Sequence, residues 1–176
     1  MNKEQTIKAL LSGQCHIGFR YKFEHIRNGV VIDTEVVDNI IPDVGRDYIL
    51  NAAMNGGAQF SSWYVGLYEG NYTPLAADTM ADFPTSATEL TTSYDETARV
   101  ALVDGALSAG LWSNAASPAE FTFNASKTVY GGFITSAPTK GGLTGILLSA
   151  VKAGTSKAVV SGDVLKVTAG ITLSSS

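Results

Sequence analysis

The sequence predicts a mainly β protein, an antiparallel β-sandwich or jelly-roll-like fold, and three observations support this class. Its 176 residues include 18 glycines. Short alternating segments recur between Gly, Pro, Ser and Asn positions, as is typical of sandwiches. Only residues 43–54 have the pattern of a long helix. With 45% hydrophobic residues, the chain is long enough for one well-buried core. We therefore expect a single β-rich domain over residues 1–176.

The N-terminal region gives the strongest local signal. Residues 3–11 can form a short helix, and residues 1–14 can act as an arm. Apolar and polar residues then alternate with the period of a half-buried strand, the apolar ones being Ile17, Phe19, Tyr21 and Phe23. Asn28 and Gly29 tolerate the positive φ angles of a type I′ turn. Residues 30–37 are therefore expected to return as the partner strand of a hairpin.

A helix is predicted over residues 43–54. Asp43 follows a proline and can cap the helix through its carboxylate. The expected inward stripe contains Tyr48, Ala52, Leu50 and Met54. Gly56 and Gly57 end the helix, as C-terminal glycines do.

The rest of the chain is predicted to be strands and ordered loops. In "WYVGLY", one face carries Trp63, Val65 and Leu67, and Trp63 is assigned to the core because large aromatics with strand periodicity are usually buried. The other face carries Tyr64, Gly66 and Tyr68. Residues 71–90 form a long connection. Further strands are expected near residues 94–104, 106–112, 119–125, 128–136, 144–151, 158–160 and 164–173.

No motif in the sequence favours an enzyme. His16 and His25 are nine residues apart, an odd spacing that puts them on opposite faces of a strand, so they are expected to be surface or strand-edge histidines. "GALSAG" places Ser108 three residues after glycine, which is not the spacing of a nucleophile elbow. "TKGG", with Lys140, lacks phosphate-loop spacing and is interpreted as a hairpin loop. We expect a protein without catalytic residues.

Composition narrows the other function classes. Cys15 is the single cysteine, so neither an intrachain disulfide nor a Cys-rich zinc site is possible, and no cofactor or metal is expected. A net charge of −4 argues against general nucleic-acid binding. No apolar run reaches the ~18 residues that span a membrane, and the N-terminus lacks the apolar centre of a signal peptide.

Charge is distributed in three blocks. Lys and Arg outnumber Asp and Glu by five to two in residues 1–27 and again in residues 105–176, whereas residues 28–104 carry two positive and twelve negative residues. Folding can mix these blocks over one solvated surface. Alternatively, acidic and basic faces can meet between copies of the chain.

Three segments together resemble a family of small proteins encoded among the virion structural genes of tailed bacteriophages. They are "GRDYILNAAMNGGAQFSSWYVGLYEGNYTPLAADTMA", "ASPAEFTFNASKTVYGGFITSAPTKGG" and "AVVSGDVLKVTAGITLSS", and the resemblance spans about residues 43–173. The resemblance implies a virion component made mainly of antiparallel strands, assembled in the host cytoplasm. It implies no catalytic residues.

The resemblance and the composition together favour a capsid decoration (cement) protein. Such a protein would bind the major capsid protein and associate with itself, with a trimer favoured because shells have local three-fold positions. The alternatives are a tail, collar or head-fibre attachment component and a carbohydrate- or receptor-binding module that uses the 70–93 loop. The candidate interface residues are Trp112, Tyr68, Tyr72 and Lys140.

Overall fold

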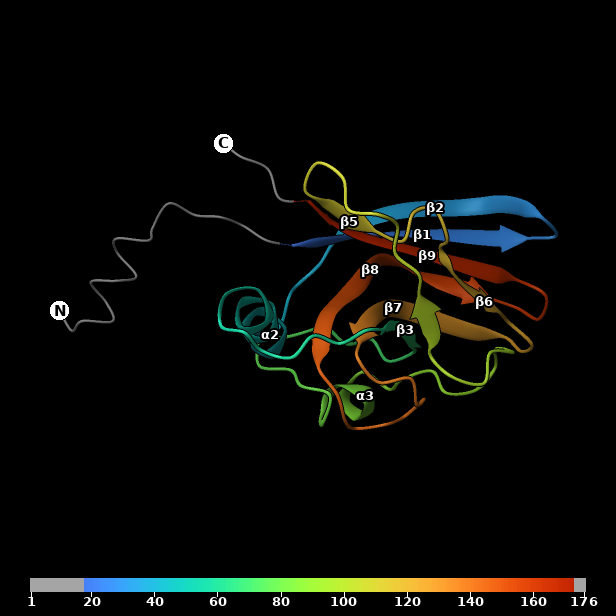
Figure 1. The fold of residues 1–176 in the computed structure, drawn as a ribbon. Coiled ribbons are helices and arrows are strands. Elements are labelled where there is room, and N and C mark those ends of the chain that lie inside the picture. Colours follow the sequence, from blue (N-terminus) through green and yellow to red (C-terminus); the bar gives the residue numbers. More distant parts are fainter. Residues whose placement is uncertain (1–17, 173–176) are drawn as a thin grey trace.

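The computed structural model describes residues 18–172, which form two antiparallel sheets packed face to face (Figure 1). The first sheet has the order β2-β1-β9, with β5 and β6 along the far edge of β9. Its strands are β1 (Phe19–Arg27), β2 (Val30–Asp38), β5 (Leu111–Ser113), β6 (Ala119–Thr122) and β9 (Val164–Thr172). The second sheet has the order β4-β3-β7-β8. Its strands are β3 (Trp63–Tyr68), β4 (Val100–Leu102), β7 (Lys127–Thr135) and β8 (Leu147–Val159).

This architecture confirms the predicted β-sandwich. Within residues 18–172, two helices accompany the sheets, α2 (Asp43–Met54) and α3 (Phe83–Ser86). The expected arm or short helix of residues 1–14 lies outside the described residues, as do Cys15, His16 and Ile17. No helix in the described part of the chain is long and apolar enough to cross a membrane.

The hairpin of β1 and β2 forms as predicted. Asn28 and Gly29 have φ angles of 52° and 76°, the positive values that a type I′ turn requires. Phe19, Tyr21 and Phe23 are buried, and their neighbours on β1 alternate outward. This alternation identifies the core face of the first sheet from sequence alone.

Helix α2 has the predicted bounds, but its cap and its buried face differ from the prediction. Pro42 is the N-cap residue and no side chain caps the helix, since Asp43 is the first helical residue and pairs with Arg46 instead. Leu50 and Met54 are 57% and 83% exposed, so the predicted inward stripe was wrong at both positions.

The helix approaches β8 through a glycine. A Cβ atom on Gly45 would lie 2.5 Å from the carbonyl oxygen of Leu148, too close for any side chain. This contact rotates Tyr48 and Ile49 toward the core and turns Leu50 outward. The contact with β8 therefore sets which face is buried, and helical periodicity alone could not locate it.

The far edge of β9 is completed by two short strands and one side chain. β5 and β6 pair with successive parts of β9, and the chain leaves the ladder between them. Fully buried Asn114 fills the gap: its Nδ2 donates to Val167 O at 3.1 Å and its Oδ1 accepts from Ala169 N at 2.7 Å. The side-chain amide thus satisfies backbone groups that a continuous strand would have paired.

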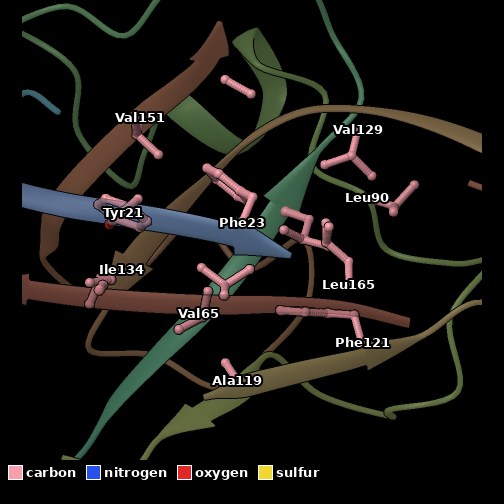
Figure 2. Packing of buried hydrophobic residues seen from close by; sticks show 14 of the residues in the cluster. Tyr21, Phe23, Val65, Leu90, Ala119, Phe121, Val129, Ile134, Val151 and Leu165 are labelled. Atoms are coloured by element: carbon pink, nitrogen blue, oxygen red, sulfur yellow. The ribbon is translucent and has the colours of Figure 1, made fainter. Parts of the chain in front are cut away.

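The main core lies between the sheets (Figure 2). Figure 2 shows side chains from both sheets meeting there, including Tyr21, Phe23, Phe121, Leu165, Val65, Ile134 and Val151. A second cluster lies on the outer side of the second sheet, where the segment that carries α3 covers it (Figure 1). Its buried members are Tyr68, Met80, Phe83, Ala87, Phe133, Leu147 and Ala150.

Some strands in the structure differ in length from the predicted ones. The strands expected at residues 144–151 and 158–160 form one strand, β8, of 13 residues. Of the strand expected over residues 94–104, only β4 (Val100–Leu102) is regular. Tyr94 makes an isolated bridge to Phe123, which follows β6 of the first sheet, so it does not extend β4.

Candidate functional site

The most distinctive surface feature is an apolar pocket of about 260 Å³ at one end of the sandwich. Six elements meet there: β1, α2, β3, β5, β8 and β9. The lining side chains are all apolar or aromatic: Phe19, Tyr48, Ile49, Trp63, Trp112, Leu148 and Ile171. The pocket therefore exists only once both sheets and the helix have packed together.

Aromatic contacts fix one wall of this pocket. The rings of Tyr48 and Trp63 meet edge to face at 5.2 Å, and Phe60 lies 5.6 Å from Trp63. The Tyr48 hydroxyl also accepts a hydrogen bond from the Phe60 backbone N–H at 2.9 Å. Phe60 is 45% exposed, so this aromatic group extends from the core to solvent.

Trp112 lines another part of the pocket. Its ring packs edge to face on buried Phe19 at 5.7 Å, and its Nε1 donates to the Asp104 carboxylate at 2.8 Å. Trp112 is half-buried. Trp63, which was assigned to the core, is also half-buried: it packs on the main core and lines the pocket with the rest of its ring. Both tryptophans of the chain therefore line one pocket.

Tyr68 cannot be an interface residue, which corrects the sequence prediction. It is fully buried, and its hydroxyl donates to the carbonyl oxygen of Val151 at 2.8 Å. Burial raises the pKa of this phenol well above its usual range. A Cβ on Gly131 would lie 2.4 Å from the same hydroxyl, so the glycine provides the space for the ring. The alternation in "WYVGLY" places Tyr68 on the face opposite Trp63, and residues of the 69–90 segment cover Tyr68 there.

Tyr72 is half-buried in the same covering segment. Its ring packs edge to face on Phe83 at 5.8 Å, and its hydroxyl donates to Asp78 at 2.7 Å. Burial, together with this bond to a carboxylate, raises the pKa of Tyr72 to about 12. Ring and hydroxyl of Tyr72 are therefore both engaged within the fold, whereas Tyr72 was a candidate interface residue.

Lys140 lies in a different cluster, in the loop between β7 and β8. Its Nζ is 3.5 Å from the centre of the Tyr94 ring, a cation–π contact. Burial lowers the pKa of Lys140, although the nearby carboxylates of Glu96 and Glu89 oppose this effect. The structure therefore does not bring the four predicted interface residues together, and only Trp112 belongs to the pocket.

A buried ion pair holds the loop that carries Lys140. Arg99 and Glu89 form a two-pronged pair at 2.8 and 2.7 Å, with both side chains essentially inaccessible. The same guanidinium donates to the carbonyl oxygens of Ala137 and Gly142. Arg99, which lies outside the loop, thus connects the "TKGG" hairpin loop to Glu89 of the covering segment.

His25 is buried, which corrects its expected surface position. Its Nε2 lies 2.8 Å from Asp163, and Arg27 binds the same carboxylate through two nitrogens at 2.9 and 2.7 Å. The hydrogen bonds from Arg27, and then those from His25 and the Val160 N–H, hold the pKa of Asp163 well below its usual range although burial opposes them. This group joins β1 to the turn before β9.

Charges from the acidic and basic blocks pair within one chain. Buried Lys157 bonds both Asp33 and Glu35 on β2 at 2.6 Å. Burial lowers the pKa of Lys157, but the hydrogen bonds to the two carboxylates raise it above its usual value. Lys127 likewise pairs with Glu69. These contacts favour the alternative in which folding mixes the charge blocks.

The outer strand β2 is the second candidate contact surface. Among the described residues it pairs only with β1, and its other edge has no strand partner. Four aliphatic side chains on it are exposed by about half or more: Val30, Val31, Ile32 and Val36. Lys157 pairs with the carboxylates of both Asp33 and Glu35, so these two side chains are engaged within the fold.

Sequence reasoning missed most of the pocket. Tyr48, Ile49, Phe19 and Leu148 come from separate elements, and no local pattern shows that they meet. The one available signal was the run of aromatics Phe60 and Trp63 after the glycines that end α2. Within residues 18–172, no group of three or more His, Cys, Asp or Glu side chains is placed to hold a metal ion.

Comparisons of this chain with protein-family models, with curated proteins and with solved structures found no match. The resemblance of residues 43–173 to phage virion proteins is therefore a prediction from the sequence, and the surfaces described above are the basis for a functional proposal.

Proposed function

We propose that this chain is a non-enzymatic structural protein of a tailed-bacteriophage virion, a capsid decoration protein that binds the major capsid protein and stabilises the shell. The observation that carries the proposal is the exposed aliphatic edge of β2. Contiguous exposed apolar side chains on a folded protein are typical of protein–protein contact sites.

The geometry of β2 suits contact with another polypeptide. A nine-residue edge strand offers unpaired backbone groups along its length, and an extended segment of a partner can add to it as a further strand. The backbone bonds would supply affinity, and Val31 and Val36 would supply apolar contact. Many such copies on a shell, with self-association as a trimer, would stabilise it through multiplicity.

The fold also supports a structural role through its rigidity. The Arg99–Glu89 pair holds the loop between β7 and β8 against the covering segment, and Asn114 completes the edge of β9. A decoration protein needs a preformed surface, since ordering costs on binding reduce affinity. The receptor-binding alternative has less support, because two candidate interface residues are engaged within the fold: Tyr68 is buried, and the Tyr72 hydroxyl is bonded to Asp78.

The decisive test is the copy number of the chain per virion, measured by quantitative mass spectrometry against the major capsid protein. Hundreds of copies would support a shell component. A dozen or fewer would indicate a tail, collar or head-fibre part, and the decoration proposal would be abandoned.

A binding experiment tests the surface itself. Purified shells of the major capsid protein are mixed with wild-type chain, with the double variant Val31→Asp/Val36→Asp, and with the control Leu107→Asp, which changes a 75% exposed residue away from β2. We expect near-stoichiometric binding by the wild type and the control, and loss of binding by the β2 variant. Equal binding by all three would exclude β2 as the contact.

A further inference from the structure

Two asparagines in the chain are each followed by glycine: Asn28 by Gly29, and Asn55 by Gly56. All four residues are exposed, and a Cβ atom on either glycine would meet nothing within 4 Å. In such a pair the backbone nitrogen of glycine can reach the carboxamide carbon of asparagine, because glycine has no side chain to obstruct the approach. Both pairs therefore have the local chemistry of a site at which asparagine loses its side-chain amide.

This deamidation needs water as its only co-reactant. The glycine nitrogen attacks Cγ of the asparagine, and the new N–Cγ bond closes a succinimide ring. The Cγ–Nδ2 bond breaks, and Nδ2 leaves as ammonia with the proton that the backbone nitrogen gave up. Water then opens the ring at one of its carbonyl carbons, which gives either aspartate or isoaspartate, in which the backbone runs through the side chain. Because the attacking nitrogen must lose its proton, the rate rises with pH.

The fold restrains the first of the two pairs. Ring closure requires the asparagine backbone to rotate, so its rate depends on how much surrounding structure must open. At Asn28 the rotation would open the turn between β1 and β2, which is closed by the pairing of Arg27 with Val30. The Arg27 side chain is in turn held by the Asp163 carboxylate at 2.9 and 2.7 Å. The hairpin therefore resists this rotation.

The second pair, at the end of α2, is held less firmly. Asn55 is the C-cap residue, and residues 56–62 belong to no helix or strand. The backbone hydrogen bonds at this turn all end on one carbonyl group, since the N–H groups of Asn55 and Gly57 both donate to the Asn51 oxygen, at 3.1 and 2.9 Å. Helix ends fray easily. The two pairs lie at opposite ends of the molecule (Figure 1), so each reports on its own surroundings.

We propose that Asn55 is a deamidation site of the folded protein, whereas the hairpin protects Asn28. The new carboxylate lies at the C-terminal end of α2, whose last turn contains no basic residue. A negative charge is unfavourable there, because the free carbonyl groups already give this end of a helix a partial negative charge. Conversion therefore loosens the last turn of α2 and the segment that leads to Phe60, whose ring packs on Tyr48 beside the pocket. This proposal does not depend on the contact role of β2.

The test follows both asparagines in one sample of the intact wild-type protein. The chain is incubated at mildly alkaline pH, folded or in guanidinium chloride, and peptide mapping by mass spectrometry gives the converted fraction of each asparagine over time. We expect Asn55 to convert at least severalfold faster than Asn28 in the folded protein, and the two to convert at similar rates in the unfolded chain. Equal or faster conversion of Asn28 in the folded protein would overturn the proposal. So would an Asn55 that stays intact while the unfolded chain converts fully.

Two variants separate the chemistry from the restraint. Asn55→Ser removes the carboxamide, so the mass change at the end of α2 should disappear while conversion of Asn28 stays the same. Asp163→Asn weakens the hold on Arg27 and should speed the conversion of Asn28 severalfold, with Asn55 as the internal control. An Asn28 rate that does not respond to Asp163→Asn would show that the hairpin contacts are not what protects it.

Discussion

The outer faces of the two sheets differ in one respect, which is whether a second layer covers them. On the second sheet, residues 69–90 with α3 pack over β3, β7 and β8, and β7 is buried along most of its length. On the first sheet, β1 alternates between buried residues and partly or fully exposed ones, and β2 is exposed almost throughout. The strands of the two sheets thus have different environments on their outer faces.

The comparison shows that a strand's sequence does not reveal what covers it. Tyr68 and Val36 both lie on an outer face, yet Tyr68 is fully buried and Val36 is 56% exposed. Contact with partners is therefore expected at the first sheet and at the sandwich end. The covered face of the second sheet contributes to stability instead.

The largest expected effect follows from removing the ring that joins the covering layer to the second sheet. Phe83 is fully buried and meets Tyr68 and Phe133 edge to face at 5.6 and 5.3 Å. Phe83→Ala should lower the free energy of unfolding by about 3–5 kcal/mol, measured by urea denaturation. The control Leu75→Ala changes a 55% exposed residue of the same segment and should cost less than ~0.5 kcal/mol. Equal losses would mean that the layer does not stabilise the sheet.

An intermediate effect is expected at Asp163, which lies between the first sheet and the turn before β9. Asp163→Asn should cost about 1.5–3 kcal/mol at neutral pH, since hydrogen bonds from Arg27 and His25 lose a charged acceptor.

The pH dependence of the Asp163 contribution has a definite sign. The folded-state pKa of Asp163 is depressed, so its contribution is complete above the unfolded value of ~3.9 and is lost as pH falls from there through the folded pKa. The difference in stability between wild type and Asp163→Asn should therefore shrink below about pH 4. The control Asp95→Asn, at an exposed carboxylate, should show little difference at any pH. A constant difference down to low pH would contradict this account.

The smallest effect is expected on the uncovered face. Val36→Asp should change the free energy of unfolding by no more than ~0.5 kcal/mol, because the side chain is more than half exposed. Thermal unfolding followed by circular dichroism would measure it. A loss comparable to that of Phe83→Ala would show that β2 is covered in the folded protein, and the proposed contact surface would have to be abandoned.

The sequence correctly predicted the elements that are specified by neighbouring residues. The hairpin turn at Asn28 and Gly29, the buried alternation of β1 and the bounds of α2 all follow from neighbouring residues. It failed where burial depends on distant segments. The buried face of α2 depends on Gly45 against Leu148, and the burial of His25 depends on Asp163.

The residues of the candidate site also divide into those that the sequence indicated and those whose contacts depend on distant segments. Trp112 was identified because an aromatic beside a loop is a reasonable contact residue, and it does line the pocket. Trp63 was placed in the core because its strand alternates, but the sandwich ends before its ring is fully enclosed. Tyr72 and Lys140 are engaged with Asp78 and Tyr94, partners that no spacing in the sequence indicates.

The sequence by itself determined the fold class, the hairpin, the helix over residues 43–54 and the charge blocks. These properties depend on backbone preferences and on side-chain periodicity, which act over a few residues. Only the tertiary structure decided which sheet face is covered, that the charge blocks pair within the chain, and that six elements form one aromatic pocket. Those outcomes depend on contacts between segments far apart in the chain, because the burial of a side chain is set by all the segments that pack around it.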